Sequence, residues 1–460
     1  MSIVQNTLAG ITAPLTRRGQ SAAANDLIDQ SWANGYMGTQ RNSADTGDLH
    51  LPGWDSQDQY REGGSVINPL KNTITVHIYP NAGLVTTAFF VNPTPNNLQI
   101  TGAKFVVTTA GTVAGASAQI THETQVGGLM QAAGGGKNVL SAVFDIHGTA
   151  ETVQTGTLAA NYNRSTRNTN VASANPGSGL IVLQPGDQLS FVPSGTLTTA
   201  VGVTITLTIL PGGKYDFVSM YVAAAATAAT ASLMTSLRPR TLMYGAAVWG
   251  VKESTAGTLT LDVTKDATAT APGAGTSMLS ATVNLKGTAH TYTQLALSAT
   301  AANLSTIYSD SVAVKISAST TELAGLLVTL AFDGKQNEQF INYNSLNSTV
   351  GTNEEFWIAD RDYQVVNFAA KWSAVEGANG RVALTSQTGT NTPGSGGIVL
   401  QTDNSNAGFD TTGTINTVNF ATLAAEQTLF VKSGDRLGLK NAGTLGSFAG
   451  FQLSARLRAM

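Results

Sequence analysis

The 460-residue chain contains no cysteine, and only 12% of its residues are charged. The absence of cysteine excludes disulfides, cysteine-ligated zinc and thiol nucleophiles. The net charge of −3 offers no basic field for the phosphates of a nucleic acid, so no nucleic-acid partner is expected. With so few charges, the surface must consist largely of Thr, Ser, Asn, Gly and Ala. That composition fits β-structure, and it also fits a protein with much surface buried against neighbours.

Long apolar runs are missing as well. The first residues, Met1–Arg18, have neither an apolar core nor an early basic run, so a signal peptide is not expected. The only long weakly apolar run, Met220–Leu237, is mostly alanine with interspersed Thr and Ser, which is too weak for a membrane span. We therefore expect a soluble protein without a membrane partner, for which export would need another route such as cell lysis.

One pattern occurs three times along the chain. In each copy an aspartate is followed 15 residues later by a glycine, and the aspartates lie 123 and 125 residues apart (310−187 and 435−310). Apolar residues fall two and four positions after each aspartate and at every second position beyond each glycine. This period of two predicts strands with one buried face, entered through a tight turn. The repeated residues are Asp187, Asp310 and Asp435, with Gly202, Gly325 and Gly450.

The front halves of the copies match too. Each has an aromatic anchor with a second large apolar residue fifteen positions before it: Phe90 and Phe105, Met234 and Trp249, Trp357 and Trp372. Short alternating strands separated by Gly, Ser, Thr and Asn predict an all-β fold of three tandem antiparallel β-sandwiches behind an extended N-terminal arm. Jelly-roll and immunoglobulin-like strand orders both stay open. A parallel β-helix is the second choice, because its period of about 20 residues is not found.

The repeats set the predicted domain boundaries. The segments between copies are interpreted as linkers, and the first of them is rich enough in alanine to form a helix. The predicted organisation is an arm over 1–70, sandwiches over 71–210, 241–333 and 363–460, and linkers over 211–240 and 334–362. The first copy carries an insertion around Asn161–Gly179, which is either a contact loop or a tolerated insertion.

The N-terminal arm is unlike the repeats. It contains one predicted short helix, Ser21–Asn34, and is otherwise polar with scattered apolar residues. Such a segment cannot close its own core. It is either a disordered leader or an arm that orders on a partner, and we favour the arm because large apolar residues are rare in disorder. The candidate docking residues are Arg17, Arg18, Leu27, Ile28, Trp32 and Trp54.

The sequence contains few signs of catalytic chemistry. Its histidines form no HExxH or HxH pattern, and neither GxSxG nor a Walker loop is present. Two acidic pairs, Glu354–Glu355 and Asp360–Asp362, could suggest a glycosidase, but ion pairing within a linker explains them without catalysis. The repeated aspartates each stand alone, which favours turn closure through their own backbone over calcium binding. We expect a protein that is not an enzyme and holds no metal or cofactor.

The texture of the repeats resembles a known family. Phrases such as PGAGTSML from Pro272, GTAHTY from Gly287 and SGDRLGLK from Ser433 look like the repetitive β-domains of tailed-bacteriophage virion proteins. These include head decoration, head-fibre and tail accessory proteins. The resemblance covers residues 88–457 in style. It implies a structural protein of the virion, often a homotrimer of identical chains, that contacts major capsid, portal or tail proteins. Under this resemblance the arm anchors the chain, and the sandwiches project or form a cement layer.

A receptor- or glycan-binding tail fibre or adhesin is the alternative. Carbohydrate sites usually present exposed aromatic residues on loops. Aromatic residues make up 7% of this chain, and the candidates outside the repeat anchors, Tyr162, Tyr292 and Tyr308, are more typical of packing. A capsule depolymerase using Asp360 is a third and weaker hypothesis.

Overall fold

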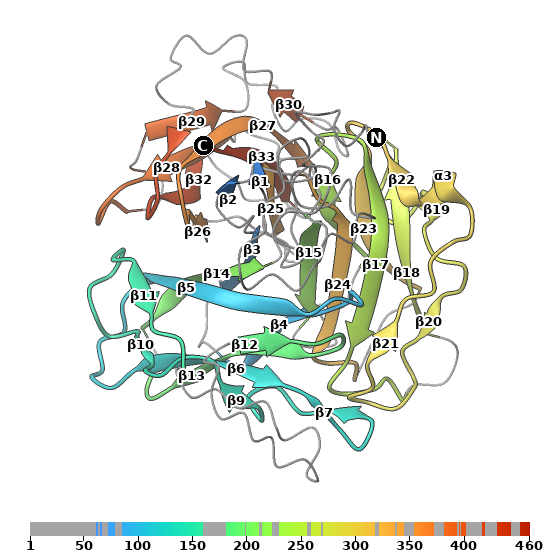
Figure 1. Cartoon of the computed structure of the whole chain (residues 1–460), viewed down its shortest axis with the longest axis horizontal. Coiled ribbons are helices and arrows are strands. Elements are labelled where there is room, and N and C mark those ends of the chain that lie inside the picture. Colours follow the sequence, from blue (N-terminus) through green and yellow to red (C-terminus); the bar gives the residue numbers. More distant parts are fainter. Residues whose placement is uncertain are drawn as a thin grey trace, which may run out of the picture. The chain divides into compact units, whose positions relative to one another are not determined.

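Figure 1 shows a computed structural model of the chain. Residues 72–209 and 213–460 form one compact unit, and residues 1–71 with 210–212 form another. In the latter unit an antiparallel pair is described, β1 (Arg61–Glu62) and β2 (Ser65–Val66). The structure describes residues 61–62, 65–66, 72–78, 85–159, 181–197, 199–210, 214–222, 230–254, 259–267, 270–317, 322–335, 338–344, 354–371, 381–392, 395, 397–401, 416–418, 430–442 and 451–460.

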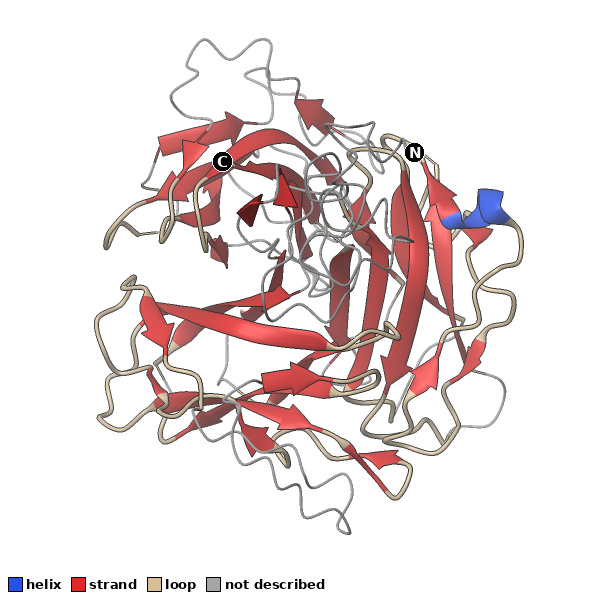
Figure 2. Ribbon diagram, viewed as in Figure 1, coloured by secondary structure: helices blue, strands red, loops and turns tan. Residues whose placement is uncertain are grey.

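The all-β fold predicted from the sequence is confirmed. Figure 2 shows antiparallel strands joined by loops, and the single α-helix among the described residues is the short α3 (Ala301–Leu304). The strands of the large unit form six sheets of four or five strands, which make three sandwiches in chain order. Three separate buried hydrophobic clusters form the cores of these sandwiches.

Sandwich 1 consists of two five-stranded sheets. The first has the order β11-β5-β14-β3, with β12 also beside β5, and comprises β3 (Asn72–Ile78), β5 (Leu98–Thr109), β11 (Gln154–Gly156), β12 (Ile181–Leu183) and β14 (Val201–Leu210). The second has the order β10-β6-β13-β4, with β9 also beside β6, and comprises β4 (Thr87–Val91), β6 (Ser117–Glu123), β9 (Lys137–Asn138), β10 (Phe144–Asp145) and β13 (Gln188–Ser194). A hairpin of β7 (Gln125–Val126) and β8 (Leu129–Met130) follows β6.

Sandwich 2 repeats this arrangement. One sheet has the order β15-β24-β17-β21, with β22 beside β17, and comprises β15 (Tyr215–Val222), β17 (Arg240–Val248), β21 (Thr293–Gln294), β22 (Ser305–Thr306) and β24 (Leu326–Asp333). The other has the order β16-β23-β18-β19, with β20 beside β18, and comprises β16 (Ala231–Thr235), β18 (Thr260–Asp266), β19 (Thr276–Ser277), β20 (Val283–Asn284) and β23 (Ser311–Ile316).

Sandwich 3 has the same plan. One sheet has the order β25-β33-β27-β30, with β31 beside β27, and comprises β25 (Glu338–Asn344), β27 (Tyr363–Lys371), β30 (Asn416–Val418), β31 (Phe430–Val431) and β33 (Gln452–Ala459). The other has the order β26-β32-β28-β29 and comprises β26 (Glu354–Ile358), β28 (Arg381–Gln387), β29 (Gly397–Gln401) and β32 (Arg436–Ala442).

The strand order identifies each sandwich as a jelly roll. When the strand positions of one sandwich are numbered from one to eight along the chain, the two sheets read 1-8-3-6 and 2-7-4-5 in all three copies. Some of the fifth and sixth positions are divided between two short strands. This order is that of two nested Greek keys, which is the jelly-roll arrangement, and it decides between the two strand orders that the sequence left open.

The predicted linkers need correction. Residues 211–240 contain β15 and β16, and residues 334–362 contain β25 and β26, so each predicted linker supplies the first two strands of the sandwich that follows. β15 and β25 pair with β24 and β33, while β16 and β26 pair with β23 and β32. Sandwich 2 therefore begins at Tyr215 and sandwich 3 at Glu338. The alanine-rich residues 223–229 lie outside the described residues.

Candidate functional site: the contacts between the sandwiches

Each repeated aspartate closes the turn that enters the seventh strand position of its sandwich. Its carboxylate accepts a hydrogen bond from the main-chain N–H three residues earlier, at 2.7 Å for Asp187 and 2.9 Å for Asp310 and Asp435. The residue before each aspartate has a left-handed φ, 78° at Gly186, 70° at Ser309 and 89° at Gly434. Ser309 thus adopts the conformation that glycine adopts in the other copies. This turn-closing hydrogen bond is the same in all three copies, and in sandwich 1 the carboxylate of Asp187 also contacts the ring Nε2 of buried His122 at 2.9 Å.

This turn also fixes the end of the second strand position. The residue that follows this strand donates its N–H to the carbonyl of the aspartate. Its own carbonyl accepts a hydrogen bond from the N–H of the residue before the aspartate. The N–H to aspartate carbonyl distances are 2.8 Å for Asn92, 2.7 Å for Ser236 and 2.9 Å for Ala359. The aspartate turn therefore holds the last residue of β4, β16 or β26 in a defined position.

That last residue hydrogen-bonds the neighbouring sandwich. The main-chain N–H of Val91 donates to the hydroxyl of Thr329 at 3.2 Å, that of Thr235 to Ser454 at 2.9 Å, and that of Ile358 to Thr206 at 3.1 Å. Each acceptor lies four residues after the repeated glycine, on the eighth strand position. The bonds run from sandwich 1 to 2, from 2 to 3 and from 3 to 1. One hydrogen bond is thus made three times in cyclic order.

Strand packing follows the same cycle. β4 packs against β15, β17 and β24 of sandwich 2, β16 packs against β25, β27 and β33 of sandwich 3, and β26 packs against β3 and β5 of sandwich 1. The three first strands, β3, β15 and β25, also contact one another. The sandwiches are therefore related by an internal threefold pattern of contacts, called here contact 1–2, contact 2–3 and contact 3–1.

The repeat-aligned residues before the aromatic anchors lie at these contacts. Phe90 meets the ring of Phe217 edge-on at 5.2 Å in contact 1–2. The indole N–H of Trp357 donates to the hydroxyl of Thr73 at 3.2 Å in contact 3–1. In contact 2–3, Phe340 of sandwich 3 belongs to the same buried cluster as Met234. The sequence aligned these three residues correctly, but their part in joining sandwiches emerges only from the structure.

Contact 1–2 combines an apolar cluster with uncharged hydrogen bonds such as that from Val91 to Thr329. Ala88 and Val91 of sandwich 1 form a buried cluster with Ala246, Val248 and Leu327 of sandwich 2. Met130, from the β7–β8 hairpin, belongs to the same cluster, and its N–H donates to the carbonyl of His290 at 2.6 Å. Burial of such side chains stabilises the contact by removing apolar surface from water.

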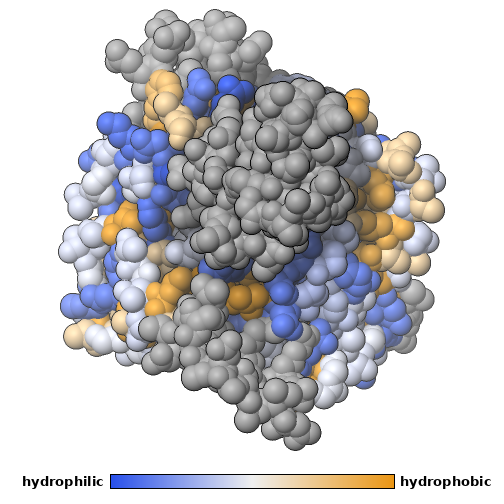
Figure 3. All heavy atoms as spheres, in the orientation of Figure 1, coloured by the Kyte–Doolittle hydropathy of each residue, from blue (hydrophilic) through white to orange (hydrophobic). Residues whose placement is uncertain are grey.

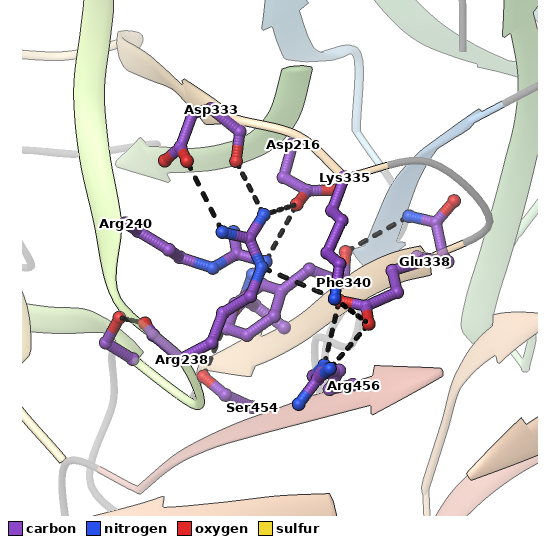
Figure 4. Close-up of polar contacts among 12 residues, drawn as sticks. Asp216, Arg238, Arg240, Asp333, Lys335, Glu338, Phe340, Ser454 and Arg456 are labelled. Carbon is purple, nitrogen blue, oxygen red and sulfur yellow. Dashed lines mark hydrogen bonds and ion pairs between the residues drawn. The ribbon is translucent and has the colours of Figure 1, made fainter. Parts of the chain in front are cut away.

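Contact 2–3 is polar and charged (Figure 4). Arg240 of sandwich 2 is buried, donates to Asp216 at 2.7 Å and lies over the ring of Phe340 at 3.7 Å from its centroid. Burial lowers the pKa of Arg240 to about 10, and Asp216 opposes this shift. Arg238 lies 3.6 Å from both Asp216 and, across the contact, Glu338 of sandwich 3. These pairs compensate the charges that the contact removes from water.

Glu338 is held by cations on both sides of contact 2–3. Burial would raise the pKa of its carboxyl, but hydrogen bonding to Arg456 and the charges of Arg456 and Lys335 bring the pKa below its usual value. A second cation crosses the same contact, since the buried ammonium of Lys371 in sandwich 3 donates to the hydroxyl of Ser311 at 2.7 Å and to the carbonyl of Thr270 at 2.8 Å.

Contact 3–1 joins two carboxyls to one guanidinium. Arg436 of sandwich 3 lies 2.5 Å from Glu151 of sandwich 1 and 2.9 Å from Glu355 of sandwich 3. Its other terminal nitrogen donates to the carbonyls of Gly389 and Asn391 at 3.0 and 2.7 Å. Glu151, Glu355 and Arg436 are all buried, with at most 2% of each residue exposed. One positive charge therefore faces two carboxyls in a region without water contact.

This charge balance affects protonation. Burial raises the pKa of Glu151 and Glu355, and the charge of Arg436 opposes the rise in both. The neighbouring Glu151 raises the pKa of Glu355 further, because two like charges in one buried site repel, whereas hydrogen bonding to Glu355 lowers the pKa of Glu151. We conclude that the pair retains a proton at pH values where an exposed glutamate has lost it.

Several sequence-predicted site residues lie outside the described residues. These are the arm residues Arg17, Arg18, Leu27, Ile28, Trp32 and Trp54, the predicted helix Ser21–Asn34, the insertion around Asn161–Gly179, and Gly450. Gly202 and Gly325 are described, with left-handed φ values of 68° and 63°. Gly202 is the second residue of β14 and Gly325 directly precedes β24, so both lie at the start of the eighth strand position, which carries the hydroxyl acceptors.

The acidic pairs have structural partners. Glu354 accepts a hydrogen bond from the Tyr343 hydroxyl at 2.5 Å, whereas Glu355 joins Arg436. Asp360 pairs with Arg361 at 3.2 Å and accepts the hydroxyl of Tyr363 at 2.6 Å. Asp362 accepts the N–H of Ser433 at 2.8 Å. The pairs lie on or beside strand β26 of sandwich 3 rather than in a linker, and of the four residues only Glu355 joins a cluster that reaches sandwich 1.

The remaining surface offers no concentrated chemistry in the described part of the chain. There, no group of three or more His, Asp or Glu side chains is placed to hold a metal ion. No described helix has the length and apolar character needed to span a membrane. On the face in Figure 3, the residues drawn in colour place hydrophobic side chains in small patches among hydrophilic ones. Scattered apolar residues of this kind do not by themselves mark a docking surface.

Comparison with protein-family models and with curated proteins finds no match to this chain.

Proposed function

We propose that this chain is a non-enzymatic structural component of a phage particle, which decorates or cements the capsid or forms a head or collar fibre. The observation that carries the proposal is the cyclic set of contacts between three jelly rolls of one chain. Jelly rolls are a recurrent fold of viral capsid proteins, although fold alone does not determine function. Such a chain matches a threefold or locally threefold position on a symmetric shell, because it can present three related surfaces there.

Charge and burial support the same proposal. Several buried ionisable groups of the large unit lie at contacts between sandwiches, such as Arg240 with Asp216 and Arg436 with Glu355, while others, such as Glu123, are bonded inside one sandwich. In an enzyme, perturbed groups usually line a cleft that a substrate can enter. Here the perturbed carboxyls of Glu151 and Glu355 lie between sandwiches and that of Glu123 lies inside sandwich 1, with at most 2% of each residue exposed. Their arrangement serves the cohesion of the particle component.

The N-terminal arm is the proposed anchor. It would dock on the particle through Arg17, Arg18, Leu27, Ile28, Trp32 and Trp54, while the sandwiches project or cover the shell. The proposed partners are other virion proteins, such as capsid, portal or tail proteins, and further copies of the same chain in a homotrimer. The proposed location is the virion.

Particle incorporation tests this function. Phage particles would be assembled with the full chain or with a chain that begins at residue 71, and the purified particles would be analysed by quantitative mass spectrometry. We expect the full chain in stoichiometric amounts and loss of the shortened chain from the particles. Substitution of Trp32 and Trp54 by alanine should reduce incorporation while leaving the sandwiches folded. Equal incorporation of all forms would refute the anchor, and absence of the full chain from particles would refute the proposed function.

A receptor- or glycan-binding module is the second candidate. One observation favours it: sandwich 2 contains a hollow of about 340 Å³ lined by Trp249, Thr282, Asn284, Thr288 and Gln294 among others. Hydroxyl and amide groups beside an indole are suited to a sugar. Only 2% of Trp249 is exposed, however, which leaves little ring surface for stacking. Specific binding on a glycan array that disappears in Trp249→Ala would favour this candidate over the structural one.

A further inference from the structure

Contact 3–1 is the one contact of the cycle that joins sandwiches not adjacent in sequence. Sandwich 1 leads directly into sandwich 2 between Leu210 and Tyr215, and sandwich 2 leads into sandwich 3 between Asp333 and Glu338. Sandwiches 1 and 3 have no such connection. The cycle is therefore closed at contact 3–1 by non-covalent interactions alone, and a weakening there would open it while the other two contacts stay tethered.

The chemistry at this closing contact is unlike that of the other two. Contact 1–2 is held by apolar side chains, and the ion pairs of contact 2–3 include Arg240 with Asp216 at 2.7 Å. Contact 3–1 instead places Glu151 and Glu355 on the single guanidinium of Arg436. With both carboxyls ionised, the buried cluster would carry a net negative charge, which is costly in a medium of low polarity.

The backbone holds Glu151 in this place. Its φ is 63°, a left-handed value that residues other than glycine seldom adopt, and its N–H donates to the carbonyl of Val107 at 2.9 Å. The equivalent residue of sandwich 2, His290, has a φ of 59°. The loop conformation is therefore shared, but in sandwich 1 it delivers a carboxyl to the neighbouring sandwich. A left-handed non-glycine residue at a buried charge cluster is the kind of outlier that accompanies function.

We propose that contact 3–1 is a proton-controlled latch, which is closed while the Glu151–Glu355 pair shares a proton beside Arg436 and opens when both carboxyls are ionised. The latch does not depend on the proposed role in a phage particle. It makes the closure of the cycle responsive to the surrounding solution, whereas contacts 1–2 and 2–3 remain as they are.

The direction follows from linkage. The folded pKa of both carboxyls lies above the ordinary value of 4.5, at about 7 for Glu151 and about 9 for Glu355. The folded, closed state therefore binds more protons than the open state between these limits. The stabilisation is fully present below the ordinary pKa and is lost as pH rises through the folded values. The latch is thus closed in acid and opens towards alkaline pH.

Other ionisable groups at contact 3–1 do not reverse this direction near neutral pH. From β5, Lys104 donates to the carbonyl of Ala359 at 2.6 Å, and burial lowers its pKa while Asp360 and Asp435 oppose the shift. Loss of the Lys104 proton would relieve the cost of burying its charge, so this group opposes the opening of the latch as pH rises. Burial and the charge of Asp362 raise the pKa of Asp435, opposed by Lys432 and Arg436, and a raised carboxyl pKa acts in the same direction as the latch. Glu354 is bonded to the Tyr343 hydroxyl.

The distance between sandwiches 1 and 3 tests the latch directly. Since the chain has no cysteine, spin labels attach only where cysteine is introduced. Exposed Thr109 of sandwich 1, Thr300 of sandwich 2 and Arg458 of sandwich 3 are suitable positions. In the full chain, pulsed electron paramagnetic resonance should show the Thr109→Cys/Arg458→Cys distance moving to longer values between about pH 6 and about pH 10. The Thr300→Cys/Arg458→Cys distance should stay constant.

Two substitutions separate proton release from general unfolding. Glu151→Gln leaves Arg436 with one carboxyl and retains hydrogen-bonding capacity, so this variant should stay closed over the whole pH range. Glu355→Gln creates the same charge balance from the other sandwich and provides the test if Glu151→Gln does not fold. Glu123→Gln, in the interior of sandwich 1, is the matched control and should open as the unmodified chain does. The latch is wrong if the unmodified chain keeps its distance, or if both contact variants open like it.

Discussion

The main-chain N–H of Ile358 donates a hydrogen bond of 3.1 Å to the hydroxyl of Thr206, although the two residues belong to the last and the first sandwich of the chain. Val91 with Thr329 and Thr235 with Ser454 repeat this bond at the other two contacts. Because Thr206 and Ile358 are both buried, water does not readily replace the hydroxyl if it is removed.

Loss of that hydroxyl should destabilise the closed cycle. We expect Thr206→Val to lower stability by about 1–3 kcal/mol, because it keeps the shape of the side chain but leaves a buried N–H without its acceptor. The loss would be read from the urea midpoint of unfolding. Thr206→Ser retains the hydroxyl and should lose clearly less. If serine and valine at this position gave the same midpoint, the bond would have no energetic importance.

The second aspartate turn offers a stabilising substitution. Ser309 has a φ of 70°, where its counterparts are Gly186 and Gly434. A side chain in this conformation costs roughly 1–2 kcal/mol of strain, which glycine would relieve. The larger unfolded-state entropy of glycine offsets roughly 0.5–1 kcal/mol of the stability gained. Ser309→Gly should therefore raise stability by up to about 1 kcal/mol, measured by calorimetry. Ser309→Ala retains the strain and should bring no gain, and an equal gain for alanine would contradict this explanation.

Glu123 gives sandwich 1 its own pH dependence. Burial raises the pKa of its carboxyl from 4.5 to about 7, opposed by hydrogen bonds from Thr121, Ser190 and the N–H of Gly134. Because the folded state prefers the protonated form, stability should fall as pH rises from about 4.5 to about 7 and level off above. Glu123→Gln should remove this fall, seen in urea midpoints across the same range.

The chain itself contains a precedent for this variant. β28 ends in Gln387 where β6 ends in Glu123, and both side chains bond a threonine two residues earlier. An amide is therefore compatible with the site. A Glu123→Gln variant whose stability kept the pH dependence of the unmodified chain would show that Glu123 is not its source.

The three contacts should not tolerate exchange of their residues. Val248 packs among apolar side chains in contact 1–2 and pairs with Leu327 in its sheet. Lys371 has the equivalent position in contact 2–3, where it pairs with Gln452. Val248→Lys would bury an ammonium without an acceptor and should cost about 3–5 kcal/mol. Val248→Met adds similar length without charge. The difference between the melting temperatures of the two variants gives the effect of the charge apart from that of side-chain length. Equal melting temperatures would mean that the contacts are interchangeable.

The sequence predicts those strands whose two faces differ in residue type. Alternation is clear in β13, β23 and β32, and in β14, β24 and β33, because apolar residues that face a core alternate with residues that are mostly smaller or polar, although the structure buries both faces of β24. The missed strands are different. β26, Glu354–Ile358, is buried along its whole length, since one face covers the core of sandwich 3 and the other meets sandwich 1. Its residues Glu354–Ile358 show no period of two, as is common in strands covered on both faces, and its two glutamates favour a linker in the sequence.

The contact residues were hidden for a related reason. Thr206, Thr329 and Ser454 all follow a repeated glycine by four positions, a regularity that the sequence contains. Their parity places them opposite the core-facing residues, where a hydroxyl ordinarily meets solvent. Likewise, nothing in the spacing connects Glu151 with Arg436, 285 residues apart. Only the cyclic packing of the sandwiches brings these positions together, and that packing depends on tertiary contacts that local patterns do not encode.

Having three sandwiches in one polypeptide changes how the cycle responds to dilution. A ring of three separate subunits dissociates as its concentration falls, whereas tethered domains retain a high effective concentration for one another. The cycle in this chain therefore persists in a single molecule, with a stoichiometry fixed by translation. Tethering also lets the three positions differ in sequence. A symmetric environment in contact with this chain would meet three related but chemically distinct domains, always in the same rotational order.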